Sequence, residues 1–477
     1  MFLSPFGGSL AWTFFRHFAP LCLANMLMRK MARAAPVWRH ARSRHRAKRH
    51  LSNKRPSVRD WGARPLALSP VAESMPRSGI RDVMDHAWGL ERTGAEVFHL
   101  EVGQPMFESP SKALHTVADS VMSKQNQGYI ANAGLPELRA TILEYYQQRL
   151  GEDALGLSVR NICTSHGCVG ALTTAFLATI NPGDEVLIAN PAWPNYEMAV
   201  KLYGGTPVYY DLKEDDGWKI DFDQLRARLS KKTKMIVICT PSNPTGAVLT
   251  LEELERLSAI CNEHDIFLLS DEIYSQIYFG NKCNGRMESN SILECTNMNP
   301  DRTIVVSGVS KAYSMTGFRV GWLVANEDII DTSIKLQEAF LSCSVPVSQL
   351  AAKTAIEMSL DGTDGGYVEN CVNEYNDRRT LALNILEKYG LRMYDPLGAF
   401  YVLVPIKEWV DRRQLQNMSE SPSVAFCKEL LDTKHVAVSP GDTFGSNTDC
   451  YIRVSLASDA RTVKVGVERL CEFIKSG

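Results

Sequence analysis

Several residues that could bind or react with a small anionic molecule stand directly after segments predicted as strands. Gly167 lies in a turn of small residues that opens a helix, and free N–H groups at such a turn suit a phosphate. Asp271 and Tyr274 follow a second strand, and Lys311 and Arg319 follow a third. Ligands bind at the carboxyl ends of the strands of an open α/β sheet, so these groups are predicted to meet in one site.

The elements that must position these groups are short apolar segments that alternate with helical periods from about Ile80 onward. This alternation is typical of a mainly parallel sheet covered on both faces. Thr250 and Glu253 form a capping box at the start of one connecting helix. After about Pro346, a long helical stretch over 351–387 and three alternating strands predict a smaller α+β domain. The predicted strands are residues 161–164, 185–189, 207–212, 235–240, 266–269, 303–306 and 320–324, then 399–404, 435–438 and 451–455.

The sequence lacks the motifs of several other classes of nucleotide-binding and catalytic proteins. The G-x-G-x-x-G run of dinucleotide-binding folds and the G-x-x-x-x-G-K-[ST] phosphate loop are both absent. Residues 308–312 approach G-x-S-x-G, but Ala312 replaces the last glycine and no suitable histidine follows. Ser307 stands four residues before Lys311, so S-x-x-K fails as well. The candidate site residues instead fit an aldehyde cofactor that carries a phosphate and is held as a Schiff base on a lysine.

The run S-G-V-S-K-A-Y-S-M-T-G-F-R-V-G-W at 307–322 closely resembles the lysine signature of the class I/II aminotransferases, which are fold-type I pyridoxal-phosphate enzymes. Asn-Pro-Thr-Gly at 243–246, and Asp271 with Tyr274, agree with this family in order and position. The resemblance extends from about Ser78 to the C-terminus. It implies an α/β fold whose large domain has a mainly parallel seven-stranded sheet covered by helices, plus a smaller α+β domain.

The resemblance implies that pyridoxal 5'-phosphate is the cofactor, and that Lys311 anchors it and moves the substrate α-proton. Asp271 would pair with the pyridine nitrogen, although an aspartate can also simply cap a strand. Asn243 and Tyr274 would hydrogen-bond the phenolate oxygen. Trp193 would stack on the cofactor ring; the simpler alternative is that it only packs against neighbouring side chains. The phosphate would be bound by Arg319, Ser310, Tyr129 and the amides of Gly167, Cys168 and Val169.

The same resemblance assigns substrate binding to Arg453, Asn243 and the loop at Gly103. Arg453 stands on an alternating strand, where an arginine is ordinarily solvated, but the resemblance makes it a bidentate clamp for the α-carboxylate. Two positions depart from the common pattern: Gly308 replaces a Ser or Thr that contacts phosphate, and Gln104 replaces an acidic residue. The implied reaction transfers an amino group from an L-amino acid to a 2-oxo acid with ping-pong kinetics.

Tyr129 lies in G-Y-I-A-N-A-G at 128–134, which resembles the family segment that reaches into the neighbouring subunit. The implied enzyme is an obligate homodimer with shared active sites; the alternative is a core tyrosine. The predicted divisions of the chain are a basic head at 1–66, an arm and part of the small domain at 67–110, the large cofactor-binding domain at 111–345, and the small domain at 346–477.

Charge is distributed unevenly along the 477 residues, whose formal net charge is -2. Residues 1–64 contain 14 Lys and Arg and one acid, Asp60, so the remainder contains 38 basic and 53 acidic side chains, a net charge of -15. The acidic body argues against a nucleic-acid partner, and the absence of a run of about 18 apolar residues argues against a membrane span. A basic head almost free of acids is typical of an organelle transit peptide, with mitochondria favoured over plastids. The alternative is an inert basic tail on a cytoplasmic enzyme.

The twelve cysteines include no C-x-x-C pair, so reduced thiols packed mostly in the core are expected, and no metal site is predicted.

Two rival functions stay open. A lyase or aminocyclopropane-carboxylate synthase would use the same fold and lysine but eliminate a side-chain group, although residues 315–319 look more like the aminotransferases. A regulator with an aminotransferase-like body would need a DNA-binding domain of ~60 or more residues ahead of it, and residues 1–64 lack that periodicity. The sequence identifies neither the amino donor nor the acceptor.

Overall fold

The computed structural model describes residues 67–124, 127–151, 156–280, 288–414 and 420–476. Contacts between residues divide the chain into Met1–Ala67 and Leu68–Gly477, and the helices and strands of the described ranges belong to the second unit. The predicted transit head at 1–66 lies outside the described residues. Within the described ranges, no helix is both long and apolar enough to cross a bilayer. The ten cysteines in these ranges are free thiols, most of them buried, as expected from the sequence.

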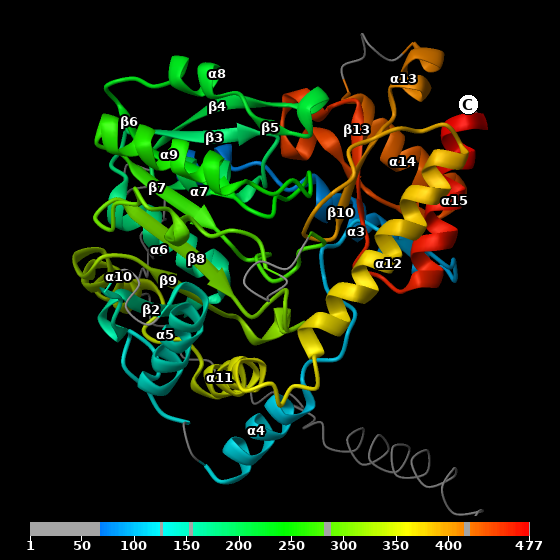
Figure 1. The fold of residues 1–477 in the computed structure, drawn as a ribbon. Helices are drawn as coiled ribbons and strands as arrows, with labels where there is room; N and C mark the ends of the chain where they lie inside the picture. The colour runs from blue at the N-terminus through cyan, green and yellow to red at the C-terminus, as the bar shows by residue number, and fades with distance from the viewer. Residues whose placement is uncertain (1–66, 125–126, 152–155, 281–287, 415–419, 477) are drawn as a thin grey trace, which may run out of the picture. The chain divides into compact units, whose positions relative to one another are not determined.

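An eight-stranded sheet forms the larger part of this unit, shown in Figure 1 in the order β2-β9-β8-β7-β6-β3-β4-β5. The five strands from β8 to β4 run parallel, whereas β9 is antiparallel to both of its neighbours. Seven of the strands are the predicted ones, and the two-residue β5 adds an eighth by pairing antiparallel with the end of β4. The strands are β2 (Ile162–His166), β3 (Glu185–Asn190), β4 (Thr206–Lys213), β5 (Lys219–Ile220), β6 (Thr233–Cys239), β7 (Phe267–Asp271), β8 (Thr303–Gly308) and β9 (Val320–Val324).

Helices cover both faces of this sheet, as the α/β pattern predicts. Alternate residues of most strands enter two separate hydrophobic clusters; Val186 and Ile188 face one cluster and Leu187 faces the other. Burial on both faces explains why these strands are continuous apolar runs. One face carries α6 (Gly167–Thr179), α7 (Asn195–Leu202) and α10 (Glu327–Phe340), and the other carries α5 (Pro136–Leu150), α8 (Phe222–Ala227), α9 (Leu251–His264) and α11 (Pro346–Leu360).

The predicted capping box begins α9. Thr250 N donates to Glu253 Oε2 at 2.9 Å, and Glu253 N donates to Thr250 Oγ1 at 3.2 Å. These bonds satisfy two N–H groups that the first helical turn leaves free. The helix therefore starts at a defined residue and returns the chain into β7, the strand that ends at Asp271.

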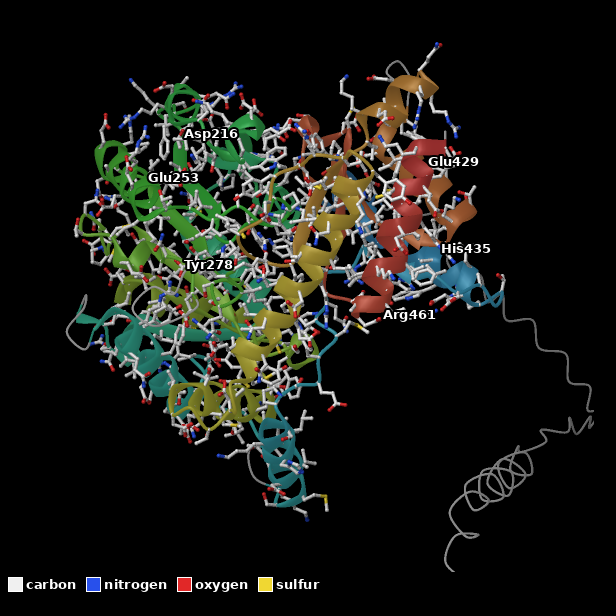
Figure 2. The ribbon with its side chains drawn as sticks, turned by 45° about the vertical axis from the view of Figure 1, so that its right-hand side comes forward. Asp216, Glu253, Tyr278, Glu429, His435 and Arg461 are labelled. Carbon is white, nitrogen blue, oxygen red and sulfur yellow. The ribbon has the colours of Figure 1, made fainter. Side chains whose placement is uncertain are left out.

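A second, smaller sheet has the order β10-β13-β12, and a separate pair joins β1 to β11 in parallel. Helices α3, α14 and α15 pack on these strands, and α12 packs on α15. In Figure 2, Asp216 and Glu253 lie on the side of the larger sheet, and Glu429 and Arg461 lie on the helices around the smaller one. The elements are β1 (Phe98–His99), β10 (Tyr401–Pro405), β11 (Val436–Ala437), β12 (Ser439–Pro440), β13 (Tyr451–Ser455), α2 (Pro70–Ser74), α3 (Gly79–Glu91), α4 (Ser111–Met122), α12 (Tyr367–Lys388), α13 (Lys407–Arg413), α14 (Pro422–Lys434) and α15 (Ala460–Ser476).

The long helical stretch predicted over 351–387 is two helices, α11 and α12. Between them Gly362, Gly365 and Gly366 have φ of +72°, +65° and +74°. A left-handed glycine ends a helix at little cost, and the apolar periodicity on either side does not reveal the break. The break lets α11 pack on α4 and α5 while α12 continues to α15.

Candidate active site

Lys311 lies in the turn after β8, at the carboxyl edge of the larger sheet. Its Nζ donates a hydrogen bond to the backbone oxygen of Gly103 at 2.6 Å and lies 5.7 Å from the centroid of the Tyr274 ring. Burial, reinforced by the positive charges of Arg453 and Arg319, lowers the pKa of Lys311 to about 8. A substantial fraction of this amine is therefore neutral near pH 8, and the neutral amine is the nucleophilic form.

Asp271 ends β7 and is 2% exposed. Its Oδ2 accepts a hydrogen bond from Tyr196 Oη at 2.7 Å, and its Oδ1 accepts from Ile273 N at 3.1 Å and from Cys168 Sγ at 3.5 Å. Burial raises the pKa of Asp271, while these donors and Lys311 oppose the rise. The carboxylate is therefore held in one orientation and is poised to pair with a cationic group.

The start of α6 forms a small cradle with Arg319. Gly167 has a left-handed φ of +72°, and a Cβ added there would lie 2.4 Å from Arg319 Nη2. This position therefore requires glycine both for its backbone conformation and for the absence of a side chain. Arg319 Nη1 donates to the backbone oxygen of Thr316 at 2.8 Å, which orients the guanidinium. Gly321 of β9 packs against Gly167, because a Cβ there would lie 2.4 Å from the Gly167 carbonyl carbon. A helix N-terminus and a guanidinium thus meet at one point, which suits an anion.

The remaining predicted phosphate ligands differ in exposure. Cys168 and Ser310 are buried, whereas the Val169 side chain is exposed on the first turn of α6. Only the backbone N–H of Val169 is needed for the predicted role. Tyr129 is 91% exposed, so this single chain leaves it on the surface.

Arg453 of β13 is 2% exposed, which excludes the solvated position that is ordinary for an arginine on an alternating strand. Its Nη1 donates to Asn243 Oδ1 at 2.9 Å, and its Nη2 donates to the Glu101 backbone oxygen at 2.5 Å and to Ser439 Oγ at 3.0 Å. Burial lowers the pKa of Arg453, but a guanidinium stays charged. Its Nε has no hydrogen-bond partner among the described residues. A buried cation with an unpaired N–H suits a carboxylate ligand.

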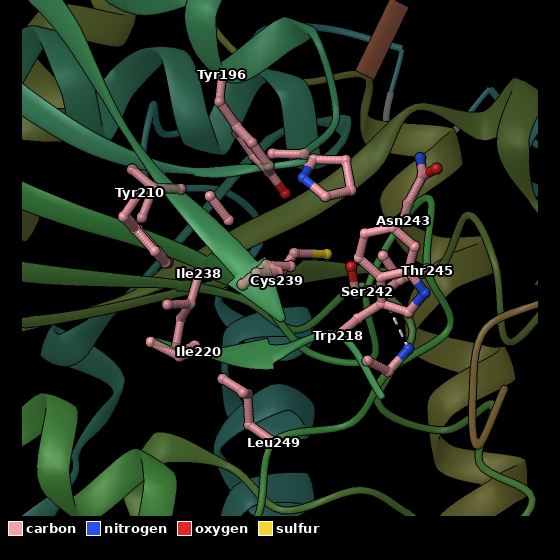
Figure 3. A pocket seen from close by; sticks show the side chains of 16 residues that line it. Tyr196, Tyr210, Trp218, Ile220, Ile238, Cys239, Ser242, Asn243, Thr245 and Leu249 are labelled. Carbon is pink, nitrogen blue, oxygen red and sulfur yellow. Dashed lines mark hydrogen bonds between the residues drawn. The ribbon is translucent and has the colours of Figure 1, made fainter. Parts of the chain in front are cut away.

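Figure 3 shows a pocket at the ends of β3 and β6, lined by Tyr196 and Asn243 among others. Asn243 is buried, and its Oδ1 accepts the hydrogen bond from Arg453. Trp193 is half-buried, and its ring meets the Tyr196 ring edge-on at a centroid distance of 5.5 Å. Contacts within the site join most of the predicted residues, namely Lys311, Asp271, Asn243, Tyr274, Arg319, Arg453, Gly103, Gly167 and Cys168.

Two residues of the site carry no predicted role. Tyr196 donates a hydrogen bond to Asp271 and so fixes its carboxylate. Tyr401, within the predicted strand 399–404, has its Oη 2.8 Å from Tyr274 Oη and its ring centroid 4.3 Å from Arg453 Cζ. The sequence signal for Tyr401 was a hydroxyl within an otherwise apolar strand.

The assembled groups fit one kind of cofactor. A lysine with a lowered pKa suits an aldehyde, a helix N-terminus beside Arg319 suits a phosphate, and the buried Asp271 suits a protonated ring nitrogen. In the ranges that the structure covers, no group of three or more His, Cys, Asp or Glu is arranged to hold a metal ion.

Comparisons with known proteins agree with this geometry. Residues 95–470 match the family model of the aminotransferases of class I and II. The (5-formylfuran-3-yl)methyl phosphate transaminase of Methanocaldococcus jannaschii is 33% identical over 83% of this chain and 96% of its own length. The aspartate aminotransferase of Bacillus sp. (strain YM-2) is 33% identical over 81% of this chain and 93% of its own length. The structure of Thermus thermophilus aspartate aminotransferase with maleate has a TM-score of 0.76 at 28% identity and covers 85% of this chain and 99% of its own. The chain therefore belongs to the class I and II aminotransferases, a pyridoxal-phosphate-dependent family, and its activity is that of a transaminase.

Proposed function

We propose that this aminotransferase moves the amino group of an L-amino acid to a 2-oxo acid at the site around Lys311, with pyridoxal 5'-phosphate as cofactor. When bound, the cofactor supplies a ring that accepts the electron pair released at the substrate α-carbon. The observation that carries the proposal is a half-buried lysine with a pKa of about 8 that shares one site with a buried aspartate and a buried arginine.

The residues that would hold the cofactor follow from the chemistry of each group. Asp271, held in one orientation by its hydrogen-bond donors, would pair with the ring nitrogen. Trp193 would cover one face of the ring, and Asn243 and Tyr274 would donate hydrogen bonds to the phenolate oxygen. The phosphate would be bound by Arg319, Ser310 and the N–H groups of Gly167, Cys168 and Val169.

The residues that would act on the substrate are Lys311 and Arg453. Arg453 would bind the α-carboxylate through its free N–H groups, while its bonds to Asn243 and Ser439 hold the guanidinium plane. The neutral amine of Lys311 would accept the proton from the α-carbon of the amino donor and pass it to the cofactor, and in the second half-reaction it would carry a proton in the opposite direction. The loop at Gly103, whose oxygen holds Lys311, would lie against the same carboxylate. Two successive half-reactions give ping-pong kinetics.

A half-reaction panel tests the proposal. Purified protein with pyridoxal phosphate is mixed with single amino acids in the absence of an oxo acid, and the absorbance of the cofactor and the products are followed. At least one amino acid should yield one equivalent of its 2-oxo acid per site without release of ammonia. Lys311→Ala should abolish the signal, whereas Lys335→Ala, on the exposed face of α10, should not. Ammonia released with the oxo acid would show a lyase instead.

We propose further that the enzyme is a homodimer in which Tyr129 completes the site of the partner subunit. The exposure of Tyr129 supports this, as do the exposed apolar side chains Met106, Leu114 and Met122, because large exposed apolar groups mark interaction surfaces. The test mixes two inactive variants, Lys311→Ala and Tyr129→Ala. In a mixed dimer with shared sites, one site receives both native residues, so activity should return. No recovery after verified subunit exchange would refute shared sites.

The basic head is proposed to direct the protein to mitochondria. Its 14 basic residues against one acidic residue support this assignment. Residues 1–66 fused to a fluorescent protein should co-localise with mitochondria, and the chain from Ala67 fused in the same way should not. Location of the first fusion in plastids or the cytoplasm would refute the assignment.

A further inference from the structure

Tyr401 touches three groups of the site from one position. It stands at the start of β10 and is 1% exposed. Its Oη lies 2.8 Å from Tyr274 Oη, and its ring centroid lies 4.3 Å from Arg453 Cζ. A Cβ on Gly103 would lie 1.9 Å from Tyr401 Oη, so this hydroxyl packs directly on the loop whose carbonyl oxygen accepts the hydrogen bond from Lys311.

The ring and the hydroxyl of Tyr401 serve different neighbours. The ring, together with Phe444 at 4.8 Å, contacts the guanidinium of Arg453. An aromatic face attracts a guanidinium and leaves its N–H groups free for hydrogen bonds in the guanidinium plane. The hydroxyl, at the edge of the ring, reaches Tyr274 and Gly103 instead. A phenylalanine at this position would keep the first set of contacts and lose the second.

The surroundings keep the hydroxyl of Tyr401 neutral. The titratable and charged groups that act on it are Arg453 on β13, Tyr274 after β7 and Cys239 on β6. Burial raises the pKa of Tyr401, and Arg453 and Tyr274 only partly oppose the rise. The hydroxyl is therefore available as both donor and acceptor across the pH range in which Lys311 titrates.

We infer that Tyr401 is a positioning residue with two separable parts: its ring holds Arg453 for the substrate carboxylate, and its hydroxyl holds Tyr274 and the Gly103 loop against Lys311. The inference rests on the proposed function, since it concerns how the same site is held. On this inference the ring of Tyr401 affects substrate affinity, and its hydroxyl affects the reaction rate. Neither Phe400 nor Phe444 can replace it, because neither carries a hydroxyl.

The experiment compares Tyr401→Phe, Tyr401→Leu and Phe444→Leu in the full chain loaded with pyridoxal phosphate. Tyr375→Phe is the matched control, because Tyr375 lies in the same aromatic cluster and its buried Oη has no partner among the described residues. Three quantities are measured: the apparent Kd and the limiting rate of the half-reaction with the best donor of the panel, and the pH midpoint of the resting cofactor absorbance. The thermal midpoint of each variant checks its folding.

Tyr401→Phe should keep Kd within about two-fold, lower the limiting rate about ten-fold, and move the pH midpoint by about half a pH unit or more. Phe444→Leu should raise Kd about ten-fold or more and leave the pH midpoint in place. Tyr401→Leu should show both effects, and Tyr375→Phe neither. If Tyr401→Phe leaves both the rate and the pH midpoint unchanged, or raises Kd as much as Phe444→Leu, the inference is wrong. If the native protein itself reacts with no amino acid, the proposed function fails instead.

Discussion

Tyr196 donates a hydrogen bond from its hydroxyl to Oδ2 of Asp271 at 2.7 Å, although 75 residues separate the two in the sequence. Both side chains are buried, and Ile273 N and Cys168 Sγ occupy the other carboxylate oxygen. A buried carboxylate that lost these donors would bind a proton more readily. Tyr196 therefore opposes protonation of Asp271 and also orients its carboxylate.

Replacing Asp271 should lower the rate of the half-reaction more than replacing Tyr196. Asp271→Asn removes the charge and should slow the half-reaction about 1000-fold or more, because the ring nitrogen loses its anionic partner. Tyr196→Phe removes one hydrogen bond to a charged group, about 1.5–3 kcal/mol, and should slow it about 10- to 100-fold. Tyr203→Phe, at the end of the same helix, is the control and should change little. Stopped-flow absorbance measures the rates; equal losses in Tyr196→Phe and Tyr203→Phe would contradict the role of Tyr196.

The pKa of Lys311 predicts how the protein without cofactor captures pyridoxal phosphate. Only the neutral amine attacks an aldehyde, and burial with two nearby guanidinium groups lowers the pKa from 10.5 to about 8. The capture rate should therefore rise about ten-fold per pH unit below pH 8 and level off above it. Arg453→Gln removes one of the positive charges and should shift this midpoint upward. A rate that still rises steeply above pH 10 in the native protein would show an ordinary lysine.

Gly167 provides a steric test of the cradle around Arg319. Gly167→Ala adds a Cβ that would lie 2.4 Å from Arg319 Nη2, at a φ of +72° that alanine rarely adopts. The variant should bind pyridoxal phosphate about ten-fold or more weakly. Gly170→Ala, in the same helix, is the control, since its added Cβ would lie 3.4 Å from its nearest neighbour, the Cβ of His166. Fluorescence titration measures both affinities, and equal affinities would show that this turn does not touch the cofactor.

His99 predicts a pH dependence of stability away from the catalytic groups. Its ring contacts Glu101 at 2.8 Å and Glu91 at 3.1 Å, and its hydrogen bond to the buried Glu101 is the main reason that its pKa rises to about 9. A raised pKa gives stability that is complete below pH 6.5 and is lost as pH rises through 9. With solvent screening of a side chain that is 28% exposed, the contribution is on the order of 1–2 kcal/mol.

Urea unfolding of the native protein and His99→Gln at pH 6 and pH 9.5 measures this effect. The native protein should exceed the variant in stability at pH 6, and the difference should shrink at pH 9.5. His86→Gln is the control, because His86 pairs with Asp432 at the surface. A difference that does not depend on pH would show that His99 contributes packing alone.

Local pattern was sufficient to predict most of the strands. The strands Val320–Val324 and Tyr451–Ser455 begin and end at their predicted residues, because burial on one or both faces imposes an apolar pattern on short segments. The capping box at Thr250 was equally visible, since its two bonds join residues only three apart. The break between α11 and α12 was missed, because a left-handed glycine changes chain direction without changing the apolar periodicity.

The sequence alone was sufficient to recognise the family and to predict Lys311 as the catalytic lysine, because the motif around Lys311 lies within one short run. The distant residues that support that run became evident only from the packing of the two sheets. Arg453 meets Asn243 across 210 residues, and Tyr401 meets Tyr274 across 127. Such pairs depend on how the two sheets pack together, whereas hydrophobic period and turn chemistry report only on near neighbours. The burial of Arg453, an arginine on an alternating strand, could be recognised only when both sheets were in place.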